Sequence, residues 1–394
     1  MTIVSTIGRA GLKFSSAYFL YFAICGISSP YLQIILKKIG YGPAAVGLLL
    51  GLYELIGILG PIVLARKADA LGRFNPFLMG SGLAIILGGF LLVAIQSPLA
   101  TVLGLGLLSL GLKTPVPVMD TSVLIALDKA RAAGRKPPNY GTLRGLGSIG
   151  YVIVVLIVQA VPGFDDKPPI VMILAMVGLT LLFLLSLSWL PETGREKPAG
   201  ERASVHLSWI DPTFIAGLAV IALGRLALAS YNSFFSLYLT ESLEWHAIGI
   251  MSALAATVEI PAMIVSWKFL RTKSPMEVIN LASAAIFVRL LIYAIFPTRA
   301  GVIAGQLLHA ICYGLFLPAS VTFINLKTPP GERTTGNALL LGFGMGLPAF
   351  LGSAFGGLIV EAVGYRWLFA IFSSFAVASM ALYHHHGDTL RAVR

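Results

Sequence analysis

Two long blocks of nearly continuous apolar sequence, residues 12–190 and 212–383, set the main constraint on how this chain can fold. Hydrophobic residues make up 57% of the 394 residues and charged residues only 11%, whereas soluble domains carry about 25% charged residues. A helix needs about 20 mostly apolar residues to cross a bilayer, so each block has room for six spans. We therefore predict an all-α polytopic membrane protein, with twelve transmembrane helices in two pseudo-symmetric six-helix bundles.

Short polar segments separate the predicted spans. The longest of them, residues 191–211, predicts a cytoplasmic linker between an N-terminal bundle (1–190) and a C-terminal bundle with a short cytoplasmic tail (212–394). Strand-like alternation is absent and the apolar runs are too long for outer-membrane strands, which favours helices over a barrel. The spans are predicted at 14–36, 44–65, 75–96, 98–127, 141–161, 169–190, 212–239, 246–268, 276–296, 300–326, 334–361 and 365–384.

The positions of the basic residues predict the topology. With the N-terminus placed in the cytoplasm, 19 of the 28 Lys and Arg residues fall on the cytoplasmic side and five on the outer side. Membrane proteins concentrate positive charge on the cytoplasmic side, so we predict that both termini are cytoplasmic. The predicted location of this multi-pass protein is a bacterial inner membrane. The net charge of +11 then reflects topology, and no nucleic-acid partner is expected.

Catalytic and metal-binding patterns are missing from the sequence. Cys25 and Cys312 both lie in apolar spans, where they offer neither a disulfide framework nor a thiolate metal site. No HExxH or GxSxG motif occurs, and the polar residues are scattered singly over many spans. We therefore expect that the protein is not an enzyme and that it holds no metal or cofactor. The lipid bilayer is an expected partner, and we expect a monomer.

An internal repeat supports the division into two halves. With an offset of 202 residues, the Val-Gly-Leu sequence at 46–48 aligns with Ile-Gly-Ile at 248–250. With an offset of 201, residues 102–117 align without gaps with 303–318. In the stretch YGTLRGLGSIGY (140–151), Gly141 and Gly147 align with Gly336 and Gly342, whereas Arg144 aligns with Leu339. Parallel six-helix repeats are typical of transporters whose halves rock about a central site.

The stretch YGTLRGLGSIGY also carries a candidate binding face. If a helix begins near its start, Gly147, Ser148 and Tyr151 lie three, four and seven residues after Arg144, on the same face. A cation and an aromatic ring that share a face within a span indicate part of a polar cavity. The alternative is that Arg144 extends from the helix end to the membrane interface.

Charges at membrane depth each need a partner, a water-filled cavity or a function, because burying one costs about 2.5 to 3.5 kcal/mol on insertion scales. The acids are Glu54, Asp120 and Glu259, and the cations are Lys113, Arg144, Arg225 and Arg289. This excess of cations predicts a positive centre that favours an anionic or strongly hydrogen-bonding solute. Replacement of Arg225 by Gln should then reduce transport of an acidic solute more than transport of a neutral one.

Glu259 is the candidate proton carrier, because burial and a nearby arginine shift the proton affinity of a carboxyl group in opposite directions. The alternative is a static ion pair with Arg289. Asp120 is a candidate partner of Arg144 or a second proton site, unless it is simply solvated from the cytoplasm. Gln306, His309 and Tyr313 would share one helical face that lines the lumen, unless His309 only bonds a backbone carbonyl.

The chain resembles the major facilitator superfamily over nearly its whole length. The segment ARKADALGRF (65–74) is similar to that superfamily's loop signature, with Asp69, Gly72 and Arg73 as the gating-loop residues. Within the superfamily the chain is most similar to the lactose-permease and phenylpropionate-permease-like group. That likeness is carried by YFAICGISSPYLQIIL, Met119-Asp120, YGTLRGLGSIGY, SYNSFFSLYL, Glu259, Arg289 and QLLHAICYGLF.

The resemblance implies a solute:proton symporter that works by alternating access. It implies substrate binding by Arg144 and Tyr151 and proton coupling through Glu259, Arg289 and His309. The predicted substrate-binding residues are Arg144, Tyr151, Asp120, Arg225, Asn232 and Tyr231. The predicted solute is a sugar or oligosaccharide first and a small organic anion second. The alternative function is an efflux pump or uniporter for an amphipathic or anionic solute such as a lysolipid or a drug.

Overall fold

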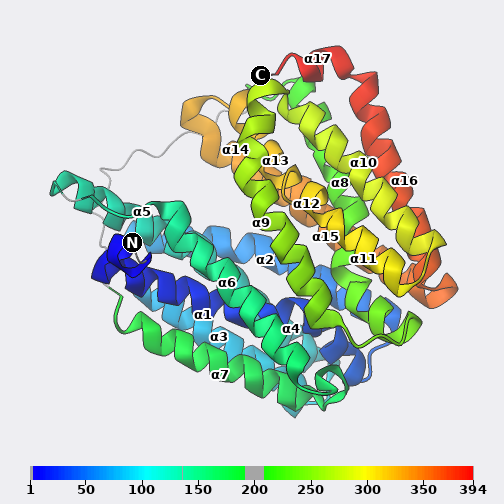
Figure 1. Ribbon diagram of the computed structural model, residues 1–394, viewed down its shortest axis with the longest axis horizontal. Coiled ribbons are helices and arrows are strands. Elements are labelled where there is room, and N and C mark those ends of the chain that lie inside the picture. The colour runs from blue at the N-terminus through cyan, green and yellow to red at the C-terminus, as the bar shows by residue number, and fades with distance from the viewer. Residues whose placement is uncertain (1–2, 135, 191–207, 394) are drawn as a thin grey trace. The chain divides into compact units, whose positions relative to one another are not determined.

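The computed structural model of the chain describes residues 3–134, 136–190 and 208–393. Over these ranges it consists of helices and connecting turns, without a β-strand, which confirms the predicted all-α fold (Figure 1). Twelve helical stretches within the described residues are long and apolar enough to cross a membrane. They are Gly11–Lys38, Pro43–Ala68, Asn75–Ala94, Pro98–Ala132, Tyr140–Ala160, Pro169–Leu187, Pro212–Ser242, Ile248–Thr272, Pro275–Ile295, His309–Lys327, Pro330–Val363 and Tyr365–His385.

The helices divide into two compact units. The first unit holds the described residues up to 39 and those from 56 to 190, and the second holds residues 40–55 and 208–393. The boundary therefore runs through α2. Most of the predicted linker at 191–211 lies outside the described residues, so the predicted domain limits stay a prediction.

Within the described residues up to 190, the chain forms seven α-helices and one short 3-10 helix. They are α1 (Ile3–Lys38), α2 (Pro43–Leu71), α3 (Asn75–Ala94), α4 (Pro98–Lys113), α5 (Pro115–Ala132), α6 (Tyr140–Ala160), η1 (Phe164–Asp166) and α7 (Pro169–Leu187). Prolines lie in the first turn of many of these helices, where a missing backbone N–H costs nothing. The Asn139 side chain accepts a hydrogen bond from the Gly141 N–H at 2.9 Å and so fixes the start of α6.

The second part begins at α8 (Pro212–Leu237). It continues with η2 (Tyr238–Ser242), α9 (Ile248–Thr272), α10 (Pro275–Ile295), α11 (Arg299–Leu307), α12 (His309–Cys312), α13 (Phe316–Lys327), η3 (Pro330–Glu332), α14 (Arg333–Leu339), η4 (Leu340–Gly346), α15 (Leu347–Val363), α16 (Tyr365–His385) and α17 (Gly387–Arg391). Ser274 and Glu277 form a reciprocal capping box at the start of α10. The side chain of Asp211 caps α8 by accepting from the Phe214 N–H at 2.6 Å.

Interruptions distinguish the structure from the simple spans that the sequence predicts. The stretch predicted as one span at 300–326 consists of α11, α12 and α13, with breaks at Leu308 and at residues 313–315. A Cβ atom added to Gly314 would lie 2.6 Å from the Ala262 Cβ atom, so the second break brings the backbone directly against α9. Two π-helical segments, η2 and η4, widen the spans that begin with α8 and α14.

Glycines set the spacing of α6 and α1 in the first unit. A Cβ atom added to Gly147 would lie 2.5 Å from the Phe22 ring, and one added to Gly150 would overlap the Phe19 carbonyl group. Gly145, by contrast, faces open space. Small residues let helix backbones approach closely within a membrane, so Gly147 and Gly150 hold α6 close against α1.

In the second unit, the first part of α2 lies against α15. A Cβ atom on Gly47 would lie 2.8 Å from the Gly357 Cα atom, and one on Gly51 would lie 2.9 Å from the Phe350 carbonyl oxygen. The Ala44 N–H donates to the Glu361 carboxylate at 3.0 Å at the end of this contact. The two helices therefore meet through their backbones rather than through long side chains.

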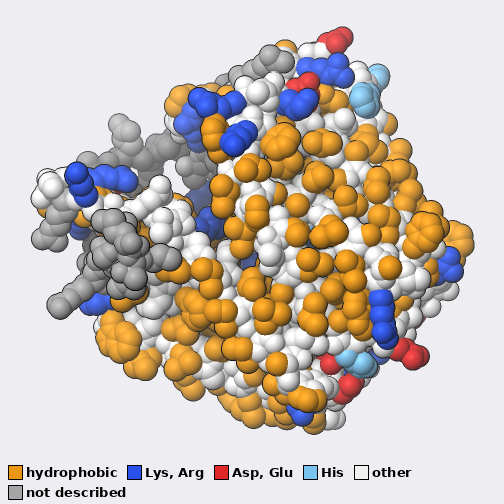
Figure 2. All heavy atoms as spheres, viewed as in Figure 1, with side chains coloured by type: hydrophobic (Ala, Val, Ile, Leu, Met, Phe, Trp, Pro, Cys, Tyr) orange, Lys and Arg blue, Asp and Glu red, His pale blue; other side chains and the backbone are white. Residues whose placement is uncertain are grey.

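The outer surfaces of the helices are apolar, as a bilayer requires. Figure 2 shows hydrophobic side chains spread over the visible face, with charged side chains gathered near helix ends. Large exposed residues such as Ile264, Trp267 and Phe355 belong to this surface. Contiguous exposed apolar surface of this kind marks contact with lipid.

Candidate functional site

Arg289 of α10 is the centre of a polar cluster inside the second unit. Its side chain is fully buried. The guanidinium donates to the Tyr293 hydroxyl at 3.0 Å and to Gln306 Oε1, and one nitrogen lies 3.1 Å from His309 Nδ1. It also lies 3.8 Å from the centre of the Tyr231 ring, a cation–π contact that is strong in a desolvated site. Arg289 is therefore held by four side chains.

His309 links Arg289 to Glu259. An arginine can only donate hydrogen bonds, so His309 Nδ1 must be the acceptor and the ring proton must sit on Nε2. His309 Nε2 lies 3.2 Å from Glu259 Oε2 and donates to it. His309 thus separates the acid from the arginine, and the alternative of a direct ion pair between Glu259 and Arg289 is wrong. We refer to Glu259, His309 and Arg289 as the relay.

Tyr313 and Asn232 extend this cluster on the other side of His309. The rings of His309 and Tyr313 are stacked, with centroids 4.2 Å apart and an interplanar angle of 8°. The Tyr313 hydroxyl donates to Asn232 Oδ1. Gln306 points to Arg289 and donates from Nε2 to the Met251 carbonyl at 3.1 Å. The predicted polar face of Gln306, His309 and Tyr313 therefore joins α8, α9 and α10.

Gln306 and His309 stay on one face across the break between α11 and α12. α11 ends at Leu307 and α12 begins at His309, but Leu308 between them has helical dihedral angles, with φ −68° and ψ −12°. Residues three apart in a helix share a face, as the sequence predicts for this pair. Both side chains consequently contact the same guanidinium.

Arg225 of α8 lies two helical turns before Asn232. Among the described residues, its Nε atom is buried without a hydrogen-bond partner. Its charge lies close enough to the Tyr313 hydroxyl to interact with it electrostatically. The structure therefore brings Arg225, Asn232 and Tyr231, all predicted to bind substrate, to the edge of the relay.

A second polar cluster lies inside the first unit. The fully buried Tyr18 of α1 donates to Asp120 Oδ1 at 2.5 Å. Arg144 is exposed, and its Nη1 atom lies 3.5 Å from the Tyr140 hydroxyl. Tyr140 interacts electrostatically with both Asp120 and Arg144. The predicted neighbourhood of Asp120 and Arg144 therefore includes Tyr140 between them.

Sequence reasoning missed Tyr18 and Tyr140 as members of this cluster. The sequence spacing could have indicated Tyr140, because it lies four residues before Arg144 and so on the same helical face. No sequence pattern could have indicated Tyr18, because its hydrogen-bond partner Asp120 is 102 residues away in the chain. Tyr151 is half-buried two turns along α6 from Arg144, as the helical spacing predicts.

The predicted gating loop follows the end of α2 at Leu71. Gly72 has a φ angle of 64°, a left-handed conformation that glycine adopts without strain. The Arg73 N–H donates to the Ala68 carbonyl at 3.3 Å and closes the turn. The backbone of Asp69 belongs to the last turns of α2, while its side chain lies outside the described part of the structure.

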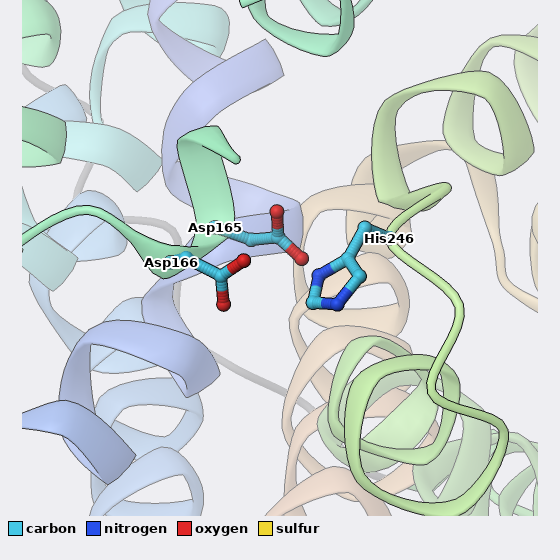
Figure 3. A group of neighbouring side chains, drawn as sticks. All are labelled: Asp165, Asp166 and His246. Carbon is cyan, nitrogen blue, oxygen red and sulfur yellow. The ribbon is translucent and has the colours of Figure 1, made fainter. Parts of the chain in front are cut away.

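Three further titratable residues are drawn in Figure 3. Asp165 and Asp166 come from η1 in the first unit, where Asp165 is buried and Asp166 is exposed. His246 precedes α9 in the second unit and is exposed. The residues belong to different units and no metal is assigned to them, so the expectation of a protein without metal stays a prediction.

Asp211 lies at the start of α8, outside the spans. Burial works against its charged form, but hydrogen bonds from Lys327 Nζ at 2.5 Å and from the Phe214 N–H outweigh that effect and lower the pKa of Asp211 below its ordinary value. The pair joins the beginning of α8 to the end of α13.

Comparison with known proteins matches this architecture. The model of the MFS_1 like family matches residues 12–371. The uncharacterized transporter YwbF of Bacillus subtilis is 24% identical over 62% of this chain, and that match spans 60% of YwbF, less than two thirds of its length. A probable 3-phenylpropionic acid transporter of Escherichia coli is 24% identical over 90% of this chain and 93% of its own length.

Two more proteins align over nearly the whole chain. The maltose permease of Geobacillus stearothermophilus is 25% identical, with 95% of this chain and 93% of the permease covered. Among solved structures, that of the nucleoside transporter NupG superposes with a TM-score of 0.82 and 17% identity, covering 95% of this chain and 100% of that one. Because the family model covers most of the twelve-span chain, the protein belongs to the MFS_1 like family and is a multi-pass membrane transporter of the major facilitator type.

Proposed function

We propose that the protein is a secondary active transporter that carries a small polar solute together with a proton, and that Glu259 carries the proton. The supporting observation is the relay, in which Glu259 accepts from His309 while Arg289 occupies the other ring nitrogen. The halves would alternate access to the solute across a bacterial inner membrane, with both termini in the cytoplasm. The transporter would act as a monomer, without catalysis and with the proton gradient as its energy source.

The order of groups in the relay favours Glu259 over His309 as the proton carrier. A second proton on His309 would have to bind Nδ1, where the Arg289 guanidinium lies 3.1 Å away, and would break that hydrogen bond. A proton on Glu259 leaves the bond from His309 Nε2 in place, because a protonated carboxyl group still has a carbonyl oxygen that accepts. The Glu259 side chain is also more exposed than that of His309, at 30% against 9%.

The proposed substrate-binding residues are Arg144, Tyr151 and Asp120 in the first unit and Tyr231, Asn232 and Arg225 in the second. Asp69, Gly72 and Arg73 would form the gating loop. A sugar and a small organic anion both fit this polar set, and the names of the maltose permease and the 3-phenylpropionic acid transporter support these two classes equally.

Uptake into proteoliposomes tests the proposal. The probes are maltose, 3-phenylpropionate and uridine, each with an inward proton gradient and with an uncoupler. We expect the gradient to concentrate one probe and the uncoupler to abolish its accumulation. Glu259→Gln should remove gradient-driven uptake but retain counterflow, which needs no net proton movement.

A matched control is Glu241→Gln, because Glu241 accepts a hydrogen bond from Tyr365 at 2.7 Å, away from the relay. It should retain gradient-driven uptake. Equilibration of a probe at the same final level with and without the gradient would instead support a uniporter. Uptake that rises when the uncoupler is added would support efflux by proton exchange.

A further inference from the structure

Arg225 carries a charge that the relay does not balance. In helices α8 to α13, the ionisable residues predicted at membrane depth are two arginines, Arg225 and Arg289, and one acid, Glu259, with His309 neutral in the relay. Glu259 is engaged with His309, and Arg289 is held by four side chains. Glu54, on the part of α2 that belongs to this unit, has contacts of its own.

Arg225 lies too deep in the span for its guanidinium to reach the membrane–water interface. Arg225 is the fourteenth residue of α8, which begins at Pro212, and the span continues to Ser242. At 1.5 Å per residue it lies about 20 Å from the start of the span and about 26 Å from its end, farther than an arginine side chain can extend. An arginine at this depth requires a counter-charge or water, and among the described residues no acid forms an ion pair with it.

Asn232 adds further donors on the same side of α8. Its Oδ1 atom accepts from the Tyr313 hydroxyl, which fixes the orientation of the amide and leaves the NH2 group on the opposite side. Asn232 is exposed and lies seven residues, or two turns, after Arg225. Tyr313 contacts both residues, through a hydrogen bond to Asn232 and electrostatically with Arg225. This edge of the cluster therefore presents a cation and a pair of N–H donors.

We infer that Arg225 and Asn232 form an anion subsite that binds the carboxylate of a small organic monoanion. The guanidinium would take the carboxylate through paired N–H···O bonds, and the Asn232 amide would donate to a free oxygen lone pair. The carboxylate of the solute would balance the positive charge of Arg225, which no acid of the helices pairs with. This inference rests on the proposed transport function and narrows its solute from the two open classes to the anionic one.

The same arrangement couples the solute to the proton. Glu259 contacts His309 and through it belongs to a cluster of charged and titratable groups. The others are Arg225 and Tyr231 from α8, Arg289 and Tyr293 from α10, and Cys312 and Tyr313 from α12 and its end. A proton on Glu259 removes the only negative charge of this set and strengthens the positive potential that a carboxylate meets. Binding of the carboxylate must favour the proton on Glu259 by the same factor. One proton and one monoanion together carry no net charge.

Equilibrium binding to the purified full-length protein tests the subsite, with 3-phenylpropionate and its uncharged amide, 3-phenylpropionamide, as matched probes. We expect the acid to bind about tenfold more tightly than the amide, and more tightly at pH 5.5 than at pH 7.5, within the ordinary range of coupling between two sites. Arg225→Gln should reduce the affinity for the acid to that for the amide, and Arg225→Lys should restore part of it. Asn232→Asp, which adds a competing carboxylate beside Arg225, should weaken acid binding more than Asn232→Ala does.

Uptake measurements separate this inference from the proposed function. A potassium-valinomycin potential should leave uptake of the acid unchanged, whereas a neutral solute carried with a proton would respond to it. If Arg225→Gln is folded by circular dichroism and gel filtration and still prefers the acid, or if the wild-type protein binds both probes equally or neither, the anion subsite is refuted. Binding of the acid that needs Arg225 but is independent of pH and of Glu259→Gln would keep the subsite and refute proton coupling.

Discussion

His309 Nε2 lies 3.2 Å from the Glu259 carboxylate, while the Arg289 guanidinium occupies the opposite ring nitrogen. This relationship assigns a different task to each end of one side chain. Nδ1 accepts and keeps the ring in place, and Nε2 donates toward the acid. His309 is therefore a positioning residue in the proposed mechanism, rather than a proton carrier.

Two amide substitutions separate these tasks. His309→Asn places an oxygen near the former Nδ1 position, and His309→Gln places an NH2 group near the former Nε2 position. We expect Asn to retain the bond from Arg289 and lose the bond to Glu259, and Gln to do the reverse. The pH dependence of uptake should therefore survive better in His309→Gln, while its thermal stability should fall further, by about 2 kcal/mol, because buried Arg289 loses an acceptor. Identical pH profiles for the two variants would contradict this assignment.

Tyr18→Phe tests the cluster of the first unit. The substitution removes the hydroxyl that donates to Asp120 at 2.5 Å and changes little else in volume. We expect a loss of about 1 to 2 kcal/mol in the free energy of unfolding, because a hydrogen bond to a charged acceptor is lost at a buried position. The shift in the midpoint of thermal unfolding between Tyr18→Phe and the wild type measures this loss of stability. Tyr31→Phe is the comparison for a general effect of losing a tyrosine hydroxyl, because Tyr31 is also buried on α1 and its hydroxyl has no hydrogen bond within the described residues.

Gly150 and Gly145 provide a matched pair on α6. A valine at 150 would overlap the Phe19 backbone, whereas a valine at 145 would extend into open space. We expect Gly150→Val to cost about 1 to 3 kcal/mol, the range for overpacking a tight contact, and Gly145→Val to lie near zero. Thermal unfolding in detergent compares them. An equal loss in both variants would mean that β-branching, not the contact with α1, is responsible.

Asp211 predicts how stability responds to acid. The pKa of Asp211 is lower in the folded protein than in the unfolded chain, so the hydrogen bonds from Lys327 and Phe214 contribute fully above the unfolded pKa of about 3.9. That contribution is lost as the pH falls through the lower, folded pKa. Lys327→Met should therefore be less stable than the wild type at pH 7, by at most about 1 kcal/mol for so exposed a pair, and the difference should shrink below pH 4. A constant difference across this range would exclude the pair as its source.

Much of the fold could be predicted because span length is dictated by the bilayer. The predicted span 365–384 and the observed Tyr365–His385 differ by one residue at one end, and the predicted 169–190 differs from Pro169–Leu187 by three. Pro169 lies in the first turn of the second of these helices, whereas the first follows Gly364. The breaks in α11 to α13 were not predictable, because they depend on how Gly314 packs on α9 and carry no distinct periodicity.

The candidate site was predictable as a set of residues but not as a set of contacts. Isolated charges in apolar sequence identified Glu259, Arg289 and His309, because burying such groups without a purpose is costly. Their order could not be derived, since residues 259, 289 and 309 come from three helices whose rotations are set by packing. The sequence left a direct ion pair between Glu259 and Arg289 open as an alternative, whereas in the structure His309 lies between them.

The π-helix η4 has a consequence for α15. Each π turn holds one residue more than an α turn, and each residue turns an α-helix by about 100°. If one turn of the glycine-rich segment Leu340–Gly346 changed to α geometry, α15 would rotate by about that angle relative to α14. Gly357 would then turn away from Gly47. Because neither glycine has a side chain, no change of rotamer could restore the contact. The number of residues per turn in η4 therefore determines which face of α15 packs against α2.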